Sequence, residues 1–286
     1  MDHLKSDSAH FEVYNSPLSE FSIVGFEYGY SVSYPKALIL WEAQYGDFNN
    51  AAQVILDQFI SSAEQKWRRH SSLTLLLPHG MEGQGPEHSS GRLERYLQLS
   101  AQNNIQVVYP STPAQYFHVL RRQGLRKIKK PLVLFTPKSL LRLPACTSSL
   151  KELEEGQFEE FLDDPIPPST IKRLLICSGK IFYDLLEARE KQKSAGISIL
   201  RIEQLYPFNT EKFIKILAKY KGFQECYWVQ EEPDNMGSWT YIRSFLTDTL
   251  KTPIRYIGRA ASASPAAGSQ IRHKEEQEEI LKLALR

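Results

Sequence analysis

The sequence predicts an α/β protein made of two three-layer α/β/α domains, each built on a mostly parallel sheet. Two observations lead to this class. Short runs that are apolar at every position alternate with amphipathic stretches of helical period, as expected for strands buried on both faces and covered by helices. The chain also has 286 residues, which is enough for two domains with sizeable cores.

In the first half, four apolar runs predict strands, and the stretches between them predict helices. The predicted strands are residues 38–41, 73–77, 105–109 and 131–135. The predicted helices are residues 49–67, 92–99 and 115–125. Four apolar residues recur at helical spacing in the first of these helices, namely Ala52, Ile55, Phe59 and Ala63.

The segment that follows interrupts this alternation. Residues 143–168 contain four prolines and an acidic run from Glu152 to Asp164, a composition typical of a linker. We therefore expect a first domain at residues 1–145, a linker at 146–169 and a second domain at 170–286. The alternative is a surface excursion within one large domain.

The alternation then resumes and predicts a second α/β domain. Its predicted strands are residues 174–176, 197–202, 226–229 and 254–257. Its predicted helices are residues 181–192, 210–220, 239–250 and 271–285, with Asn209 or Thr210 as the cap of the second.

Composition excludes several classes of protein. Lys and Arg number 35 against 33 Asp and Glu, so the near-neutral charge gives no reason to expect nucleic acid or a membrane surface as a partner. No apolar run approaches the ~20 residues that span a bilayer, and Met1 to Asp7 do not form a secretory signal. Cys146, Cys177 and Cys226 lack metal or disulfide spacing, which favours reduced thiols in a cytoplasmic protein.

The segment after the second predicted strand is the strongest candidate for a site. Three glycines and two prolines impose an irregular path on residues 78–86, and His79, Glu82, Glu87 and His88 lie on or beside it. Imidazoles shuttle protons near neutral pH, so we expect a loop that transfers protons or contacts substrate. A purely structural loop is the alternative, and the absence of ligand spacing argues against a metal site.

Two further segments carry candidate residues. Residues 41–50 follow the first predicted strand and place Gln44, Tyr45 and Phe48 where sites form in parallel sheets, although a simple strand-to-helix turn is equally compatible. Ser16 and Pro17 predict a helix start with Glu20 in its first turn, where a carboxylate ordinarily complements the helix dipole. Nucleotide, phosphate-loop and nucleophile-elbow motifs are absent from the sequence.

Several of these runs resemble one enzyme family, the thiamine-diphosphate-dependent first component of the 2-oxoglutarate dehydrogenase complex. The resemblance covers residues 11–286. It is carried by SEFSIVGFEYGY (19–30), WEAQYGDF (41–48), DQFISS (57–62), LLLPHG (75–80), EGQGPEHSS (82–90), TPAQYFH (112–118), LRRQ (120–123), TPKSLLR (136–142), QEEPDNMG (230–237) and SASPA (262–266).

The resemblance implies a transketolase-like pyrimidine-binding domain, incomplete at its N-terminus, followed by a transketolase C-terminal-like domain. The family's Gly-Asp-Gly…Asn motif, which holds Mg²⁺ and diphosphate, has no counterpart in the chain. We therefore expect a fragment or a split subunit that is inactive without its partner domain. The cytoplasm of a bacterium, or the mitochondrial matrix of a eukaryote, is the implied location.

The resemblance also implies roles for particular residues. Glu20 would bond the pyrimidine ring nitrogen of thiamine diphosphate, so that the cofactor's own amino group acts as a base. Tyr45 or Phe48 would stack on the pyrimidine, with Gln44 beside them. His88 would serve the substrate or later proton transfers, and His79 is a weaker catalytic candidate.

The implied reaction is oxidative decarboxylation of 2-oxoglutarate and transfer of the succinyl unit to a lipoyl group of the succinyltransferase component, a step of the tricarboxylic acid cycle. The family's site lies between two subunits, so a homodimer or a missing N-terminal half is the expected partner. Two alternatives stay open: a non-catalytic dimerisation or regulatory remnant of such an enzyme, and the pyrimidine-side subunit of another 2-oxo acid dehydrogenase.

Overall fold

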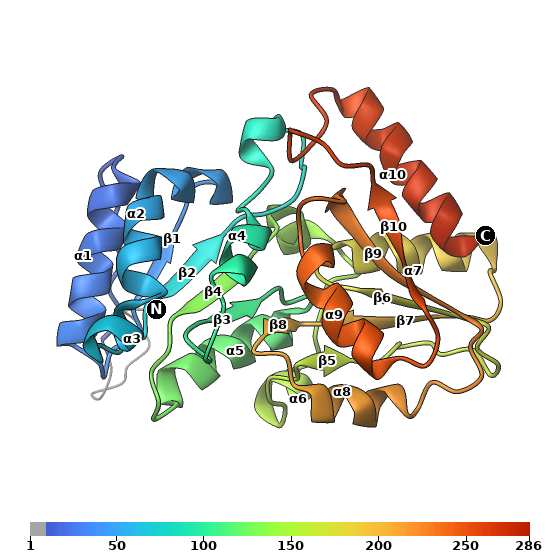
Figure 1. The fold of residues 1–286 in the computed structure, drawn as a ribbon, viewed down its shortest axis with the longest axis horizontal. Helices are drawn as coiled ribbons and strands as arrows, with labels where there is room; N and C mark the ends of the chain where they lie inside the picture. Colours follow the sequence, from blue (N-terminus) through green and yellow to red (C-terminus); the bar gives the residue numbers. More distant parts are fainter. Residues whose placement is uncertain (1–9) are drawn as a thin grey trace.

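The computed structural model describes residues 10–286 and shows two five-stranded sheets, each with helices on both faces (Figure 1). The predicted α/β class with mostly parallel sheets is confirmed. Residues 1–9 lie outside the described part of the chain. The prediction that Met1 to Asp7 do not form a secretory signal falls on these residues. No helix in the described part is long and apolar enough to cross a bilayer.

The first sheet has the strand order β1-β2-β4-β3-β8. Its strands are β1 (Leu40–Glu42), β2 (Thr74–Leu77), β3 (Gln106–Val108), β4 (Leu132–Phe135) and β8 (Gln204–Tyr206). The first four pair in parallel, and only β8 runs antiparallel, against β3. Both faces are apolar: Leu75 and Leu77 pack on one side, whereas Leu76 packs on the other. This is why the predicted strands read as unbroken apolar runs.

Helices cover the two faces of this sheet. Leu75 and Leu77 lie in one cluster with residues of α1 (Glu20–Ser33), α2 (Gln53–Ile55) and α4 (Leu93–Gln98). On the opposite face, Leu76 lies in a second cluster with residues of α5 (Pro113–Leu125). The start of α1 at Glu20 corrects the start that we predicted from Ser16 and Pro17.

The continuous helix predicted at residues 49–67 is wrong. The structure divides this region into a 3₁₀ helix (η1, Gly46–Ala52), α2, a π-helical turn (η2, Leu56–Ile60) and α3 (Ala63–Trp67). The hydroxyls of Ser61 and Ser62 donate to the Leu56 and Asp57 carbonyls. These polar side chains compete for backbone acceptors and interrupt the regular pattern, although the apolar spacing is helical.

The second sheet has the order β10-β9-β6-β7-β5, and only its edge strand β5 is antiparallel. Its strands are β5 (Phe161–Leu162), β6 (Arg173–Cys177), β7 (Ile197–Ile202), β9 (Glu225–Pro233) and β10 (Ile254–Arg259). Leu175 packs with α7 (Ile181–Gln192) and α10 (Gln270–Leu285). Leu174 packs on the opposite face with α8 (Thr210–Leu217) and α9 (Trp239–Thr249).

The two sheets exchange strands across the predicted division. The segment expected as a linker, 146–169, contains α6 (Leu150–Glu154) and strand β5 of the second sheet. Conversely, β8 comes from the predicted second domain and completes the first sheet. The domain limits at 145 and 170 stay a prediction, but this segment is structured and is not a free tether.

Asp164 anchors the end of this segment. Its carboxylate is buried and accepts hydrogen bonds from both terminal nitrogens of Arg189, from the Ser198 hydroxyl and from the Ile199 and Ile166 amides. Burial alone would raise the pKa of Asp164, but the bond from Arg189 and the other donors hold it below its usual value. The carboxylate is therefore ionised at neutral pH and ties the segment to β7 and α7.

Replacing Asp164 with alanine should lower the free energy of unfolding by about 3–5 kcal/mol, because Arg189 would be left buried without its partner. Urea unfolding at pH 7 measures the change. The adjacent Asp163→Ala is the matched control, since Asp163 is 42% exposed and pairs with the exposed Lys219. The control substitution should lower the free energy of unfolding by at most about 1 kcal/mol.

Because the pKa of Asp164 is lower in the folded state, the difference in stability between D164A and wild type should shrink as the pH falls through that pKa. Equal losses from both variants would contradict the anchoring role.

Candidate functional site

Three aromatic rings gather where β1 and β2 end. Tyr45 and Phe48 lie at the start of η1, which follows β1, and His88 ends the short 3₁₀ helix η3 (Pro86–His88), which follows β2. The His88 ring centroid lies 4.5 Å from that of Tyr45 and 5.6 Å from that of Phe48. Tyr45 and Phe48 meet edge to face at 5.8 Å. The structure therefore brings these three predicted site residues together.

The contacts of His88 define which nitrogen is available. Its Nδ1 lies 2.9 Å from the Gln84 carbonyl oxygen, which can only accept, so Nδ1 carries the proton and donates. In the neutral ring this leaves the Nε2 lone pair as an acceptor. The side chain is 27% exposed, so solvent and small molecules can reach it. His88 thus has the form of a general base or a hydrogen-bond acceptor.

A cation completes the ring cluster. Lys138 Nζ lies 4.0 Å from the centroid of the Tyr45 ring and donates to the Gln44 carbonyl at 2.6 Å. The contact of Gln44 with this cation is therefore made by its backbone, and its side chain is exposed. The role predicted for Gln44 in cofactor binding stays a prediction.

Glu20 is the first residue of α1 and is half-buried. Within residues 10–286 its carboxylate has no hydrogen-bond or ion-pair partner, and it lies in the first turn, where the helix dipole favours a negative charge. Helix α1 packs against η1, the element that carries Tyr45 and Phe48. Glu20 is thus available to an incoming group on the same part of the fold.

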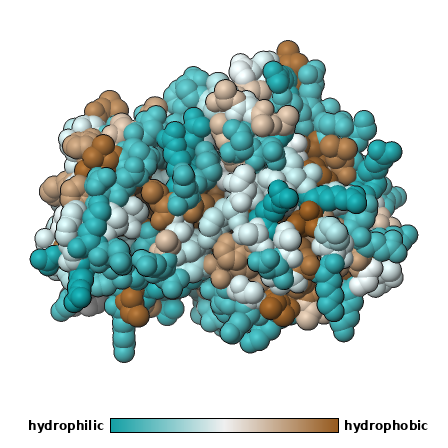
Figure 2. Space-filling model, viewed as in Figure 1, coloured by the Kyte–Doolittle hydropathy of each residue, from teal (hydrophilic) through white to brown (hydrophobic). Residues whose placement is uncertain are grey.

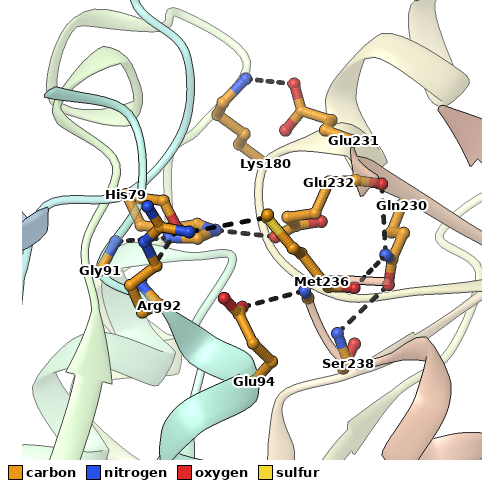
Figure 3. A network of polar contacts seen from close by, with 12 residues as sticks. His79, Gly91, Arg92, Glu94, Lys180, Gln230, Glu231, Glu232, Met236 and Ser238 are labelled. Atoms are coloured by element: carbon orange, nitrogen blue, oxygen red, sulfur yellow. Dashed lines mark hydrogen bonds and ion pairs between the residues drawn. The ribbon is translucent and has the colours of Figure 1, made fainter. Parts of the chain in front are cut away.

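His79 has a different environment from His88. It is only 4% exposed, and its ring packs against Tyr109 and Phe135. Its Nδ1 accepts from the Gly91 amide at 3.0 Å, and its Nε2 lies 2.7 Å from Oε1 of Glu232, as Figure 3 shows. Both ring nitrogens are therefore occupied, which leaves neither free for substrate.

The charge of Glu232 controls the titration of His79. Burial alone would lower the pKa of His79, but the hydrogen bond and the negative charge of Glu232, together with the charges of Glu94 and Glu231, raise it. The same pairing lowers the pKa of Glu232, against the effect of its own burial. The pair joins the carboxyl end of β2 to the end of β9, and so joins the two sheets.

Further polar contacts surround this pair at the junction of the two sheets (Figure 3). Lys180 Nζ lies 2.6 Å from Glu231 Oε1, and the Gly237 amide donates to Glu94 Oε2 at 3.0 Å. The Gln230 side chain accepts from the Ser238 and Trp239 amides. Sequence reasoning gave residues 230–232 no role, although their place at the carboxyl end of a parallel strand was a usable signal.

Two adjoining pockets lie beside the junction. The narrower one is lined by His79, Glu232, Arg259 and His273 among others. The wider one has a volume of about 370 Å³, also has Arg259 in its lining, and is formed largely by the small side chains of residues 260–268. No cluster of three or more His, Cys, Asp or Glu in the described part could hold a metal ion.

Comparison with known proteins identifies both halves of the chain. The family "Transketolase, pyrimidine binding domain" matches residues 1–144, and the family "2-oxoglutarate dehydrogenase C-terminal" matches residues 147–285. The chain belongs to the first of these families, and its second half is similar to the second. The resemblance noted in the sequence is thereby confirmed, as is the transketolase-like nature of the first α/β unit.

Curated relatives match over the full chain. It is 52% identical to the 2-oxoglutarate dehydrogenase E1 component of Rickettsia conorii and 50% identical to that of Haemophilus influenzae, covering 100% of this chain in both cases. The E1 component of Cupriavidus necator is 48% identical over 99% of the chain. The chain spans only 30–31% of the length of these relatives.

Glu232→Gln should lower the pKa of His79 below the ordinary histidine value of about 6.5, because burial, the largest effect, would then be opposed only by the smaller effects of Glu94 and Glu231. In wild type, the raised pKa stabilises the fold below the unfolded-state pKa, and this stabilisation is lost as pH rises through the folded-state pKa. In the variant, stability should instead increase as the pH rises through the lowered folded-state pKa towards about 6.5, the ordinary histidine value, and level off above it.

NMR titration of the His79 ring and urea unfolding at several pH values measure these effects. Glu231→Gln is the matched control, since Glu231 pairs with Lys180 and acts on His79 only through a smaller charge effect. An equal drop in the His79 pKa in both variants would show that the direct contact with Glu232 is not the cause.

Proposed function

We propose that this chain is the pyrimidine-binding and C-terminal part of a thiamine-diphosphate-dependent 2-oxoglutarate dehydrogenase E1 component. The observation that carries the proposal is the cluster of Tyr45, Phe48 and His88 beside α1, the helix that begins with Glu20. This arrangement occurs in a chain that is about half identical to E1 components along its whole length.

The residues present fit the pyrimidine half of thiamine diphosphate. Tyr45 and Phe48 offer aromatic faces to a planar heterocycle, and the Glu20 carboxylate, which has no partner within residues 10–286, can share a proton with a ring nitrogen. The chain carries no Gly-Asp-Gly…Asn motif, so we assign Mg²⁺ and the diphosphate to another domain. When bound, the cofactor supplies the electron sink for loss of carbon dioxide from a 2-oxo acid.

The roles of the chain's own residues follow from these positions. Glu20 holds a proton at the pyrimidine ring nitrogen, and Tyr45 and Phe48 orient the ring by stacking. Nε2 of His88 accepts or returns a proton at the substrate, 2-oxoglutarate, or at the acyl unit passed to the lipoyl group of a succinyltransferase component. The bacterial relatives support a cytoplasmic location.

The exposed face of α1 supports an assembled enzyme. Phe26, Tyr30 and Tyr34 follow each other at four-residue spacing, their neighbouring rings lie 6.1 and 6.0 Å apart, and all three are 44–65% exposed. Figure 2 shows apolar surface at the end of the molecule that α1 forms. We assign this face to contact with a second copy of the chain or with the polypeptide that provides the diphosphate-binding domain.

The proposal is tested by complementation. The chain is mixed with the part of the Haemophilus influenzae relative that it does not cover, and binding of thiamine diphosphate with Mg²⁺ is followed by calorimetry. We expect tight binding and succinyl transfer to a lipoyl domain only in the mixture, since each part supplies half of the site. Binding and activity that are absent from the mixture, with this chain folded, would favour the non-catalytic remnant.

Glu20→Gln should slow proton loss from C2 of the thiazolium by at least about 100-fold in the complemented enzyme, because the ring nitrogen loses its proton-sharing partner. Hydrogen–deuterium exchange at C2 measures this rate, and calorimetry should show cofactor affinity changed by much less. Glu27→Gln is the matched control: it lies on the same helix and is also half-buried, but two turns from the helix start. An unchanged exchange rate in E20Q would remove Glu20 from the mechanism.

Phe26→Glu should weaken assembly, because a charge would be buried in the contact made by α1. Sedimentation velocity of the chain alone and of the complemented mixture measures the change. Phe117→Glu is the control, since Phe117 is comparably exposed (45%) but lies on α5, on the other face of the sheet. Assembly that is equally strong in all three proteins would rule out this face as the interface.

A further inference from the structure

His88 lies on a loop whose own contacts do not explain its position. Residues 79–91 connect β2 to α4, and Gly80, Gly83 and Gly85 adopt positive φ angles there. Two hydrogen bonds close the loop internally. The Gly80 amide donates to the Ser89 carbonyl at 2.9 Å, and the Ser89 hydroxyl donates to the Gly85 carbonyl. These bonds shape the loop, but its placement against Tyr45 and Phe48 requires contacts from outside it.

Asp47 makes the first of these contacts. It lies between Tyr45 and Phe48 in the sequence and is 9% exposed. Its Oδ2 atom accepts a hydrogen bond from the Ser90 amide at 3.0 Å. Burial raises the pKa of Asp47, and the Ser90 amide acts in the opposite direction. The acceptor for the loop is therefore carried by the same turn that carries the two rings.

The backbones of the two segments also touch directly. The Gly46 amide donates to the Pro78 carbonyl at 2.9 Å, and a Cβ atom at Gly46 would lie only 2.4 Å from that oxygen. The Asn49 side chain donates to the Gly91 carbonyl at 3.0 Å. The turn at residues 46–49 is thus in contact with both ends of the loop.

The second contact reaches the loop from Glu232 of the second sheet, through the ring of His79, the first residue of the loop. The Gly91 amide donates to Nδ1 of this ring, and its Nε2 is held by Glu232. Two consecutive peptide N–H groups, those of Ser90 and Gly91, therefore point to acceptors on different elements. One acceptor belongs to the turn that carries the rings, and the other is fixed by the second half of the chain.

We propose that Asp47 and His79 are positioning residues that hold the Ser90 and Gly91 amides and thereby keep the His88 ring against Tyr45 and Phe48. The proposal rests on the proposed function, because His88 is the group that acts on the substrate there. Neither residue touches the substrate in this scheme. His79 thus changes from a weak catalytic candidate to a residue that acts through the loop.

The test uses NMR of the 286-residue chain with isotope-labelled histidine and no cofactor. The rings of Tyr45 and Phe48 shift the resonances of the His88 ring, and a Tyr45→Leu/Phe48→Leu double variant calibrates the size of that shift. Asp47→Ala should lose at least half of it. Asp47→Asn, which keeps an oxygen acceptor for Ser90, should retain most of it.

Two further variants separate positioning from general destabilisation. His79→Phe keeps a ring in the Tyr109–Phe135 environment but removes the acceptor for Gly91, so it should also reduce the shift. Asp57→Ala removes a partly buried carboxylate that bonds Gln53 and does not contact the loop, so it should leave the shift intact. An unchanged shift in both D47A and H79F would overturn the proposal.

Amide exchange in the wild-type chain decides the question even if the variants do not fold. The Ser90 and Gly91 amides should exchange more slowly than the Gly83 amide by at least about 100-fold, since only the first two have buried acceptors. Equal exchange rates would overturn the proposal. These readouts need no cofactor, so failure of the positioning role and failure of thiamine diphosphate binding are observed separately.

In the complemented enzyme, a positioning role has a kinetic signature. D47A should lower kcat at least 10-fold while the Kd for thiamine diphosphate stays within threefold, and D47N should restore most of the rate. Loss of cofactor binding with unchanged kcat at saturation would instead place Asp47 in the cofactor site and contradict the proposal.

Discussion

The buried pair of His79 and Glu232 is the interaction on which the arrangement of the molecule depends. It joins the carboxyl end of β2, which leads into the loop that carries His88, to the carboxyl end of β9. His79 is buried and the Glu232 side chain is only 15% exposed, so loss of either partner would leave the other largely shielded from water without its hydrogen bond. The two sheets are therefore held in one relation by a polar contact and not by apolar packing alone.

Most of the regular structure was predictable because the strands are apolar on both faces. Runs such as Leu73–Leu77 and Ile197–Ile202 have no solvent-facing position, and this pattern identifies a covered parallel sheet without any knowledge of the partners. Helices α7 and α10 followed from their periodicity. The break within residues 49–67 could not be predicted, because it depends on which carbonyls the Ser61 and Ser62 hydroxyls reach.

The exchanged strands were also beyond sequence reasoning. Strand β5 has only two residues, and β8 has three, so neither carries a recognisable period. Their identity as strands comes from the edges they meet. Among the site residues, Tyr45 and Phe48 were predicted after one strand and His88 after another, and the parallel pairing of β1 with β2 brings them together. The burial of His79 depends on a glycine-rich path that no short-range rule specifies.

The passage of the chain from β7 to β8 has a practical consequence. Glu203 lies between these strands and is fully buried. Its carboxylate accepts hydrogen bonds from both the amide and the hydroxyl of Ser111. The boundary between the two matched families, near residue 145, is therefore a poor place to divide the gene for separate expression. A piece ending there would present the bare edge of β3 to other molecules and would be prone to aggregate, whereas the second piece would carry an unsatisfied buried acid.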